Sequence, residues 1–269
     1  MNKLFLLLIS IITAIGANAN QVDTIEVFSN SMNINVKNVV ILPAGYENLT
    51  NLPVLYLLHG YGGNHKDWIN IKPDLPELAT RYNMIIVCPN GKNSWYWDSP
   101  VNANVRYETY VSKELPEYVD NNYKTKKDRS GRAITGLSMG GHGGLWLGIR
   151  HQDIFGACGS TSGGVDIRPF PKNWEMENSL GDYTENNERW NNHTVITQLH
   201  LIKPDLVIII DCGIDDFFYD VNEKLHKELL YLNIKHDYIT RPGTHNRQYW
   251  NNSIEYQLLF FSRYFFSGS

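Results

Sequence analysis

Short apolar runs alternate along the chain with segments whose apolar residues recur at helical spacing. The runs that predict strands span residues 36–42, 54–59, 84–88, 132–135, 206–211 and 236–240. Several of these runs are apolar at nearly every position, which is typical of strands buried on both faces of a parallel sheet. Helical spacing marks residues 107–122, 140–150, 219–232 and 254–266, with Pro116 expected to kink or break the first of these.

This alternation predicts one α/β domain, a mostly parallel central sheet with helices on both faces. Residues 162–200 fit neither pattern. They are rich in Gly, Pro, Asn and Trp and are long for a connection within a compact domain. Long connections often form lids or binding loops, but the sequence leaves the role of this one open.

The N-terminus has the pattern of a secretory signal peptide. Lys3 supplies a positive charge, residues 4–15 are apolar, and Ala17-Asn18-Ala19 matches a signal-peptidase site. The apolar run is too short to span a bilayer, which takes about 20 residues. We therefore expect residues 1–19 to be removed and residues 20–269 to form the catalytic domain. A protein of this kind is secreted or periplasmic and does not stay inserted in the membrane.

Composition excludes several other classes. The chain has 24 basic and 28 acidic side chains and no basic block, so nucleic acid is not an expected partner. Three cysteines, Cys88, Cys158 and Cys212, lie in or beside predicted strands and are expected to be buried free thiols. No spacing of Cys or His suggests a zinc site, and we expect neither a metal nor an organic cofactor.

The strongest chemical motif is Gly136-Leu137-Ser138-Met139-Gly140, between a predicted strand and a Gly-rich predicted helix. In a strand-to-helix turn this tight, the residues flanking a nucleophilic serine must be small, as glycine is at 136 and 140. The start of the helix also favours negative charge developing near Ser138. Ser138 is therefore the expected nucleophile.

A serine nucleophile needs a histidine base and an acid that orients the base, here in the chain order Ser, Asp, His. The sequence LVIIIDCGIDDF offers Asp211, Asp215 and Asp216, and the two in the loop beyond Gly213 can turn toward the site. We favour Asp216 and keep Asp215 open. His245 follows the last predicted strand and is the expected base.

Two backbone N–H groups are needed to stabilise the oxyanion that forms when the serine attacks. Met139, directly after the nucleophile, supplies one. The other is expected from the loop His59-Gly60-Tyr61-Gly62-Gly63, where we favour Tyr61 and keep Gly60 as the alternative.

The stretches LPVLYLLHGYGG, GLSMGG, SGGVDIRP, DCGIDDF and PGTH together resemble the putative esterase (esterase D) family of α/β-hydrolases. That family includes feruloyl and acetyl-xylan esterases, tributyrin esterases, S-formylglutathione hydrolases and the antigen 85 mycolyltransferases. The resemblance implies the α/β-hydrolase fold, a triad of Ser138, Asp216 and His245, and oxyanion donors at Tyr61 and Met139.

Aromatic residues suggest where the substrate binds. Trp95 follows a predicted strand at the edge of the sheet where ligands bind in α/β folds, and it could stack on a sugar or aromatic acyl group or simply pack under the loop. Trp174 and Trp190, in the long connection, could form the opposite wall, and His65 could touch substrate.

The resemblance and the signal peptide together predict a secreted serine carboxylesterase acting on acetyl or feruloyl groups of plant-type carbohydrate. Its partner is then a small-molecule or carbohydrate ester; nothing in the sequence indicates the oligomeric state. Three alternatives stay open: an S-formylglutathione hydrolase-like thioesterase, a sugar acyltransferase, and a non-catalytic carbohydrate-binding protein.

Overall fold

The structure is a computed structural model that describes residues 19–266. Nearly all of the expected signal peptide therefore lies outside the described residues. None of the helices in the described part combines the length and the apolar character needed to cross a bilayer.

The described residues form one eight-stranded sheet, in the order β1-β2-β4-β3-β5-β6-β7-β8. Strands β3 to β8 run parallel, β2 lies antiparallel to β4, and β1 lies antiparallel to β2. The strands are β1 (Gln21–Ser29), β2 (Ile34–Leu42), β3 (Val54–Leu58), β4 (Ile85–Pro89), β5 (Arg132–Gly136), β6 (Ala157–Thr161), β7 (Val207–Gly213) and β8 (Asp237–Arg241). The predicted α/β class with a mostly parallel sheet is confirmed.

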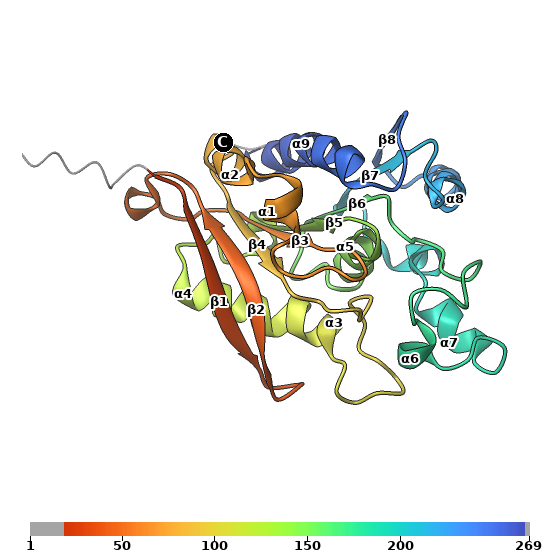
Figure 1. Ribbon diagram of the computed structural model, residues 1–269. Coiled ribbons are helices and arrows are strands. Elements are labelled where there is room, and N and C mark those ends of the chain that lie inside the picture. Colours follow the sequence, from red (N-terminus) through yellow and green to blue (C-terminus); the bar gives the residue numbers. More distant parts are fainter. Residues whose placement is uncertain (1–18, 267–269) are drawn as a thin grey trace, which may run out of the picture.

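Helices cover both faces of this sheet, because successive side chains of each strand point to opposite faces. In β3, Val54, Tyr56 and Leu58 belong to one apolar cluster, while Leu55 and Leu57 belong to another. Figure 1 shows α2 and α9 on one side of the sheet and α3 and α4 on the other. The helices are α1 (Asp67–Ile71), α2 (Leu75–Arg81), α3 (Tyr107–Thr109), α4 (Leu115–Asn122), α5 (Met139–Arg150), α6 (Glu177–Leu180), α7 (Asn187–Asn192), α8 (Tyr219–Tyr231) and α9 (Arg247–Phe266).

Some elements were not predicted from the sequence. β1 is a half-exposed edge strand, and α1 and α2 are each under three turns long. β6 (Ala-Cys-Gly-Ser-Thr), the strand expected around Cys158, lacks bulky apolar residues and was not among the apolar runs. The predicted helix over 107–122 is interrupted as expected, by a π-helical stretch (Tyr110–Glu114) that ends just before Pro116. Helix α9 begins at Arg247, seven positions before the predicted start. The three cysteines are buried and unpaired, as expected.

Candidate active site

Ser138 lies in a strained turn between β5 and α5. Its φ of 55° and ψ of −118° are unusual for a residue with a side chain. The turn needs glycine on both sides: a Cβ at Gly136 would lie 2.5 Å from the Leu58 carbonyl oxygen, and a Cβ at Gly140 only 2.4 Å from the same atom. The Ser138 N–H donates to the Thr161 carbonyl at 2.9 Å, which ties the turn to the end of β6.

The structure brings Ser138, His245 and Asp216 into one hydrogen-bonded chain. Ser138 Oγ lies 2.9 Å from His245 Nε2, and His245 Nδ1 lies 2.9 Å and 3.0 Å from the two carboxylate oxygens of Asp216. Asp216 is also fixed by the Phe218 N–H, which donates to Oδ1 at 2.8 Å. Its side chain is fully buried, so water does not compete for these bonds.

The neighbouring Asp215 occupies a different environment. Its side chain is exposed, while its backbone N–H donates to the Gly243 carbonyl at 3.0 Å. This bond joins the acid loop to the loop that carries His245. Of the two adjacent aspartates, Asp216 is therefore the one that the fold turns toward His245.

Asp211, the third aspartate of this stretch, anchors the loop that carries His245 (the histidine loop). It is fully buried and accepts hydrogen bonds from Arg241 Nη2 at 2.7 Å and from Ser253 Oγ at 2.5 Å. Burial raises the pKa of Asp211, even though Ser253 and the Arg241 charge act to lower it. Because Arg241 precedes His245 and Ser253 follows it in α9, one carboxylate holds both ends of the loop.

The loop after β3 lies directly beside the nucleophile. A Cβ at Gly60 would lie 2.7 Å from Leu137 Cδ1 and 3.3 Å from the Cβ of Ser138, so any larger residue here would have to displace the Leu137 side chain. His59 holds the loop in place, because its Nε2 accepts the Gly91 N–H at 2.8 Å. Met139 begins α5, where the first N–H groups of a helix have no partner within the helix. The backbone at Gly60 therefore lies beside Ser138, and Met139 follows Ser138 directly at the start of α5.

The structure corrects the expectation for Trp95. Its side chain is 1% exposed and packs against Trp97, with ring centroids 5.6 Å apart, so it cannot form a wall of an open cleft. The alternative, packing beneath the loop, is what occurs. Trp190 is fully buried as well, and His65 is partly buried on the loop after β3.

Trp174 does lie near the triad. Its ring stacks on Phe217 with centroids 5.8 Å apart, and the Phe217 ring lies 4.2 Å from the His245 ring. Phe217 is 53% exposed and was missed in the sequence, because nothing in its position showed that its ring meets His245. The buried ring of Trp95 packs against the ring of Trp174, with centroids 5.9 Å apart.

His142, four residues after Ser138, is a packing residue. Its Nε2 accepts the Trp97 indole N–H at 2.9 Å, and its Nδ1 lies 3.1 Å from the Gly164 carbonyl, to which it donates. Burial lowers the pKa of His142 to about 3, so the ring is neutral at ordinary pH. With both nitrogens occupied, it is not available as a base.

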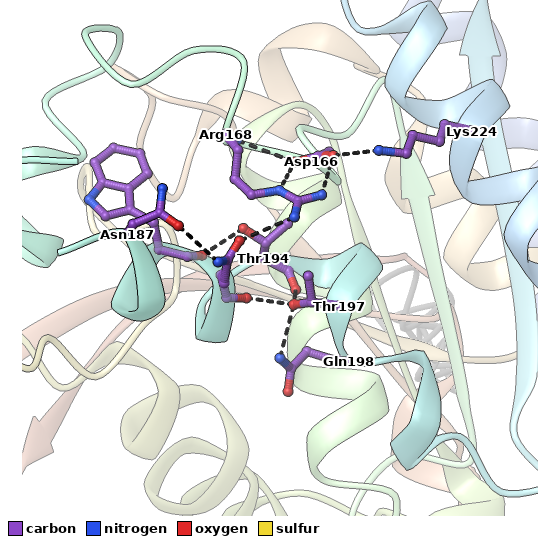
Figure 2. Close-up of polar contacts among 9 residues, drawn as sticks. Asp166, Arg168, Asn187, Thr194, Thr197, Gln198 and Lys224 are labelled. Carbon is purple, nitrogen blue, oxygen red and sulfur yellow. Dashed lines mark hydrogen bonds and ion pairs between the residues drawn. The ribbon is translucent and has the colours of Figure 1, made fainter. Parts of the chain in front are cut away.

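The long connection over 162–200 is a folded cap held by polar contacts. Figure 2 shows Asp166 between Arg168 and Lys224. Arg168 donates to both carboxylate oxygens of Asp166 at 2.7 Å, and Lys224, on α8, lies 3.4 Å away. Farther along, Thr197 Oγ1 donates to the Asn191 and Thr194 carbonyls at 2.5 and 2.7 Å. The contact with Lys224 ties the start of this segment to α8, and the Thr197 bonds stabilise a turn in its last part.

The fold and the turn at Ser138 define the α/β-hydrolase class, and comparison with known proteins gives the family. The model of the family described as "Putative esterase" matches residues 29–261, and the chain belongs to that family. It is 29% identical over 219 residues to an acetyl esterase of Caldicellulosiruptor saccharolyticus, covering 76% of this chain and 81% of the relative.

Two solved structures extend the comparison. A ferulic acid esterase has a TM-score of 0.79 at 27% identity, covering 91% of this chain and 99% of its own. An S-formylglutathione hydrolase from Staphylococcus aureus has a TM-score of 0.80 at 20% identity, covering 90% of this chain and 99% of its own, a likeness of fold. The protein is thus a carboxylic ester hydrolase with the α/β-hydrolase fold.

Proposed function

We propose that this protein is a serine esterase in which Ser138 attacks the ester, His245 transfers protons and Asp216 orients His245. The observation that carries the proposal is the continuous hydrogen-bonded chain from Ser138 Oγ through His245 to the buried Asp216 carboxylate. A serine hydroxyl is a weak nucleophile until a base in hydrogen-bond contact accepts its proton.

In the first half of the reaction, Ser138 Oγ bonds to the ester carbonyl carbon as its proton passes to His245 Nε2. The carbonyl oxygen becomes an oxyanion, which the N–H groups of Met139 and of Tyr61, or its neighbour Gly60, stabilise by hydrogen bonds. The bond to the leaving alcohol then breaks, and His245 Nε2 gives that alcohol its proton. Asp216 stays ionised and stabilises the imidazolium.

In the second half, water attacks the acyl group on Ser138. His245 Nε2 accepts a proton from the water and returns it to Ser138 Oγ when the acyl group leaves as the carboxylic acid. The residues named here supply the nucleophile, the proton transfer and the charge stabilisation, and the proposed mechanism uses no metal or organic cofactor.

We propose that the substrate is an acetyl or feruloyl ester of a plant-type carbohydrate. Two relatives support this choice: the acetyl esterase, and the ferulic acid esterase at 27% identity. The exposed ring of Phe217, stacked on Trp174 and close to His245, also offers a flat apolar surface beside the reacting atoms. Aromatic rings of this kind bind other rings by stacking.

Release of acetate and ferulate from acetylated and feruloylated xylan, measured beside p-nitrophenyl acetate, tests this function. We expect turnover of the small ester and of at least one of the xylans, undiminished by exhaustive treatment with EDTA. A folded protein that hydrolyses none of them would favour a non-catalytic binding protein. Preference for S-formylglutathione over every oxygen ester would favour the thioesterase alternative.

A further inference from the structure

We propose that an open cavity between the acid loop and the histidine loop binds the hydroxyl-rich alcohol half of the ester. The inference rests on the proposed esterase function and assigns a site to the leaving group. The cavity has a volume of about 560 Å³ and is lined mainly by Ile214, Asp215, Phe217, Asp220, Thr244 and His245.

The direction of proton transfer points to this place. His245 Nε2 must hand its proton to the leaving oxygen, so the alcohol half of the substrate has to lie against His245 during that step. The cavity shares His245 as a wall with the site of reaction. The alcohol can therefore extend into the cavity while the acyl carbonyl remains at Ser138 and the oxyanion donors.

The lining has the chemistry that a sugar needs. Phe217 is 53% exposed and Ile214 is 47% exposed, which gives an apolar surface at the rim. The side chains of Asp215, Asp220 and Thr244 are also exposed. Sugar hydroxyls donate hydrogen bonds to carboxylates, while the C–H face of a sugar ring packs on an aromatic ring.

The two carboxylates are available for a ligand. Within residues 19–266, neither Asp215 nor Asp220 forms an ion pair, whereas Asp211 and Asp216 are engaged with Arg241 and His245. The wall is also held in position, because the Asp215 N–H is bonded to the Gly243 carbonyl across the two loops. The site therefore exists before a ligand arrives, which reduces the entropic cost of binding.

The same carboxylates select against one alternative leaving group. Glutathione carries two carboxylates and one ammonium group, so an acidic rim repels part of it, whereas a neutral sugar meets no such charge. Like charges brought together at a binding site disfavour the wrong partner. The charge of the cavity thus favours a sugar ester over a glutathione thioester.

A site for the departing alcohol is also a site for an alcohol that attacks the acyl-enzyme, since the two steps are the reverse of each other. A sugar hydroxyl in the cavity would bond to the acyl carbon on Ser138 and give its proton to His245 Nε2. The proton returns to Ser138 Oγ as the serine ester bond breaks, and the acylated sugar leaves. This step allows the cavity to be tested without a natural substrate.

The experiment supplies p-nitrophenyl acetate as donor with xylobiose and methanol as competing acceptors, and measures acetyl-xylobiose and methyl acetate by mass spectrometry. The ratio of the two products does not depend on how fast the acyl-enzyme forms. We expect the wild type to favour xylobiose per mole of acceptor. Asp220→Asn should lower this ratio about fivefold, because the neutral amide oxygen accepts a weaker hydrogen bond than the carboxylate. Phe217→Leu should lower the ratio as well. Asp153→Asn is the matched control, because Asp153 is exposed and precedes β6 at the opposite edge of the sheet; its ratio should equal that of the wild type.

The proposal is overturned if the wild type shows no preference for xylobiose over methanol, or if Asp220→Asn and Phe217→Leu both keep the wild-type ratio. It is also overturned if the enzyme hydrolyses S-formylglutathione more efficiently than acetylated xylobiose. Failure of the wild type to release p-nitrophenol at all would instead refute the esterase function on which the proposal rests.

Discussion

At the scale of single residues, burial separates three aspartates that lie within six positions of one another. Asp211 is buried and holds Arg241, Asp216 is buried and holds His245, and Asp215 is exposed. The sequence alone separated Asp211 from the two aspartates of the loop and favoured Asp216, but it left Asp215 open as the acid. The difference arises from the turn after Gly213, which determines where each side chain points.

Asp216→Asn should reduce kcat for p-nitrophenyl acetate on the order of 10³-fold or more, because an amide neither holds the required imidazole tautomer nor stabilises its positive charge. Asp215→Asn should reduce it by less than about tenfold, since the Asp215 side chain is exposed and the hydrogen bonds of His245 Nδ1 go to Asp216. Steady-state kinetics on the two purified variants gives the comparison, with circular dichroism to check folding. The reverse ranking would make Asp215 the acid.

Trp174 and Trp95 should respond differently to truncation. Trp174→Ala should lower kcat/KM for feruloyl esters about fivefold more than for p-nitrophenyl acetate, because a large substrate makes contacts that a small one lacks. Trp95→Ala should instead lower the free energy of unfolding by about 3–5 kcal/mol, the usual cost of deleting a buried tryptophan. Urea unfolding and kinetics on both variants separate the roles. Selective loss of feruloyl ester activity in a stable Trp95→Ala protein would restore Trp95 to the substrate site.

At the scale of elements, hydrophobic periodicity predicted the long or fully apolar helices and strands and missed the short or half-exposed ones. β3, β5, β7, α5 and α8 were predicted to within two residues at either end. The edge strand β1 and the short helices α1 and α2 were missed, because their stability comes from packing against the sheet rather than from local pattern. The triad could be predicted because each member follows a strand of recognisable pattern. The contact of Phe217 with His245 could not be predicted, since it depends on the path of the loop after β7.

Glu108 on α3 connects two helices and should make stability depend on pH. Its carboxylate accepts hydrogen bonds from Trp146 and Arg150 of α5 and from His151, each at 2.9 Å. Burial alone would raise the pKa of Glu108, but the bonds from His151 and Arg150 and the Arg150 charge lower it from 4.5 to about 2. A lowered pKa means that folding favours the ionised form, so the stabilisation is present above pH 4.5 and is lost as the pH falls toward 2.

The full effect amounts to roughly 3 kcal/mol, at about 1.4 kcal/mol for each pKa unit. Glu108→Gln should therefore lower the unfolding free energy at pH 7 and flatten its decline between pH 4.5 and 2. Glu117→Gln, an exposed change on α4, should follow the wild-type curve. Parallel pH dependence in Glu108→Gln and the wild type would show that other groups control acid unfolding.

At the scale of the whole molecule, the parallel sheet gathers the site from distant parts of the chain. Loops after β3, β5, β7 and β8 meet because the carboxyl ends of parallel strands share one edge. The cap over 162–200 then adds Trp174 to the same edge. Although the order of motifs in the sequence was sufficient to predict this meeting point, the folded state of the cap was not evident from its composition.

We also propose that the protein is exported and cleaved after Ala19. The expectation follows from Lys3, the apolar run over 4–15 and Ala17-Asn18-Ala19. N-terminal sequencing of the protein recovered outside the cytoplasm should begin at Asn20. An intact N-terminus at Met1 with activity confined to the cytoplasm would contradict export.

Ser138 is the proposed nucleophile, and labelling of the active site with a covalent inhibitor tests this role. A fluorophosphonate should add once per chain, peptide mass spectrometry should place the adduct on Ser138, and hydrolysis of p-nitrophenyl acetate should fall in proportion to labelling. Ser138→Ala should melt at the wild-type temperature, take no label and lose essentially all turnover. Undiminished hydrolysis by folded Ser138→Ala, or a stoichiometric adduct on another residue, would show that Ser138 is not the nucleophile.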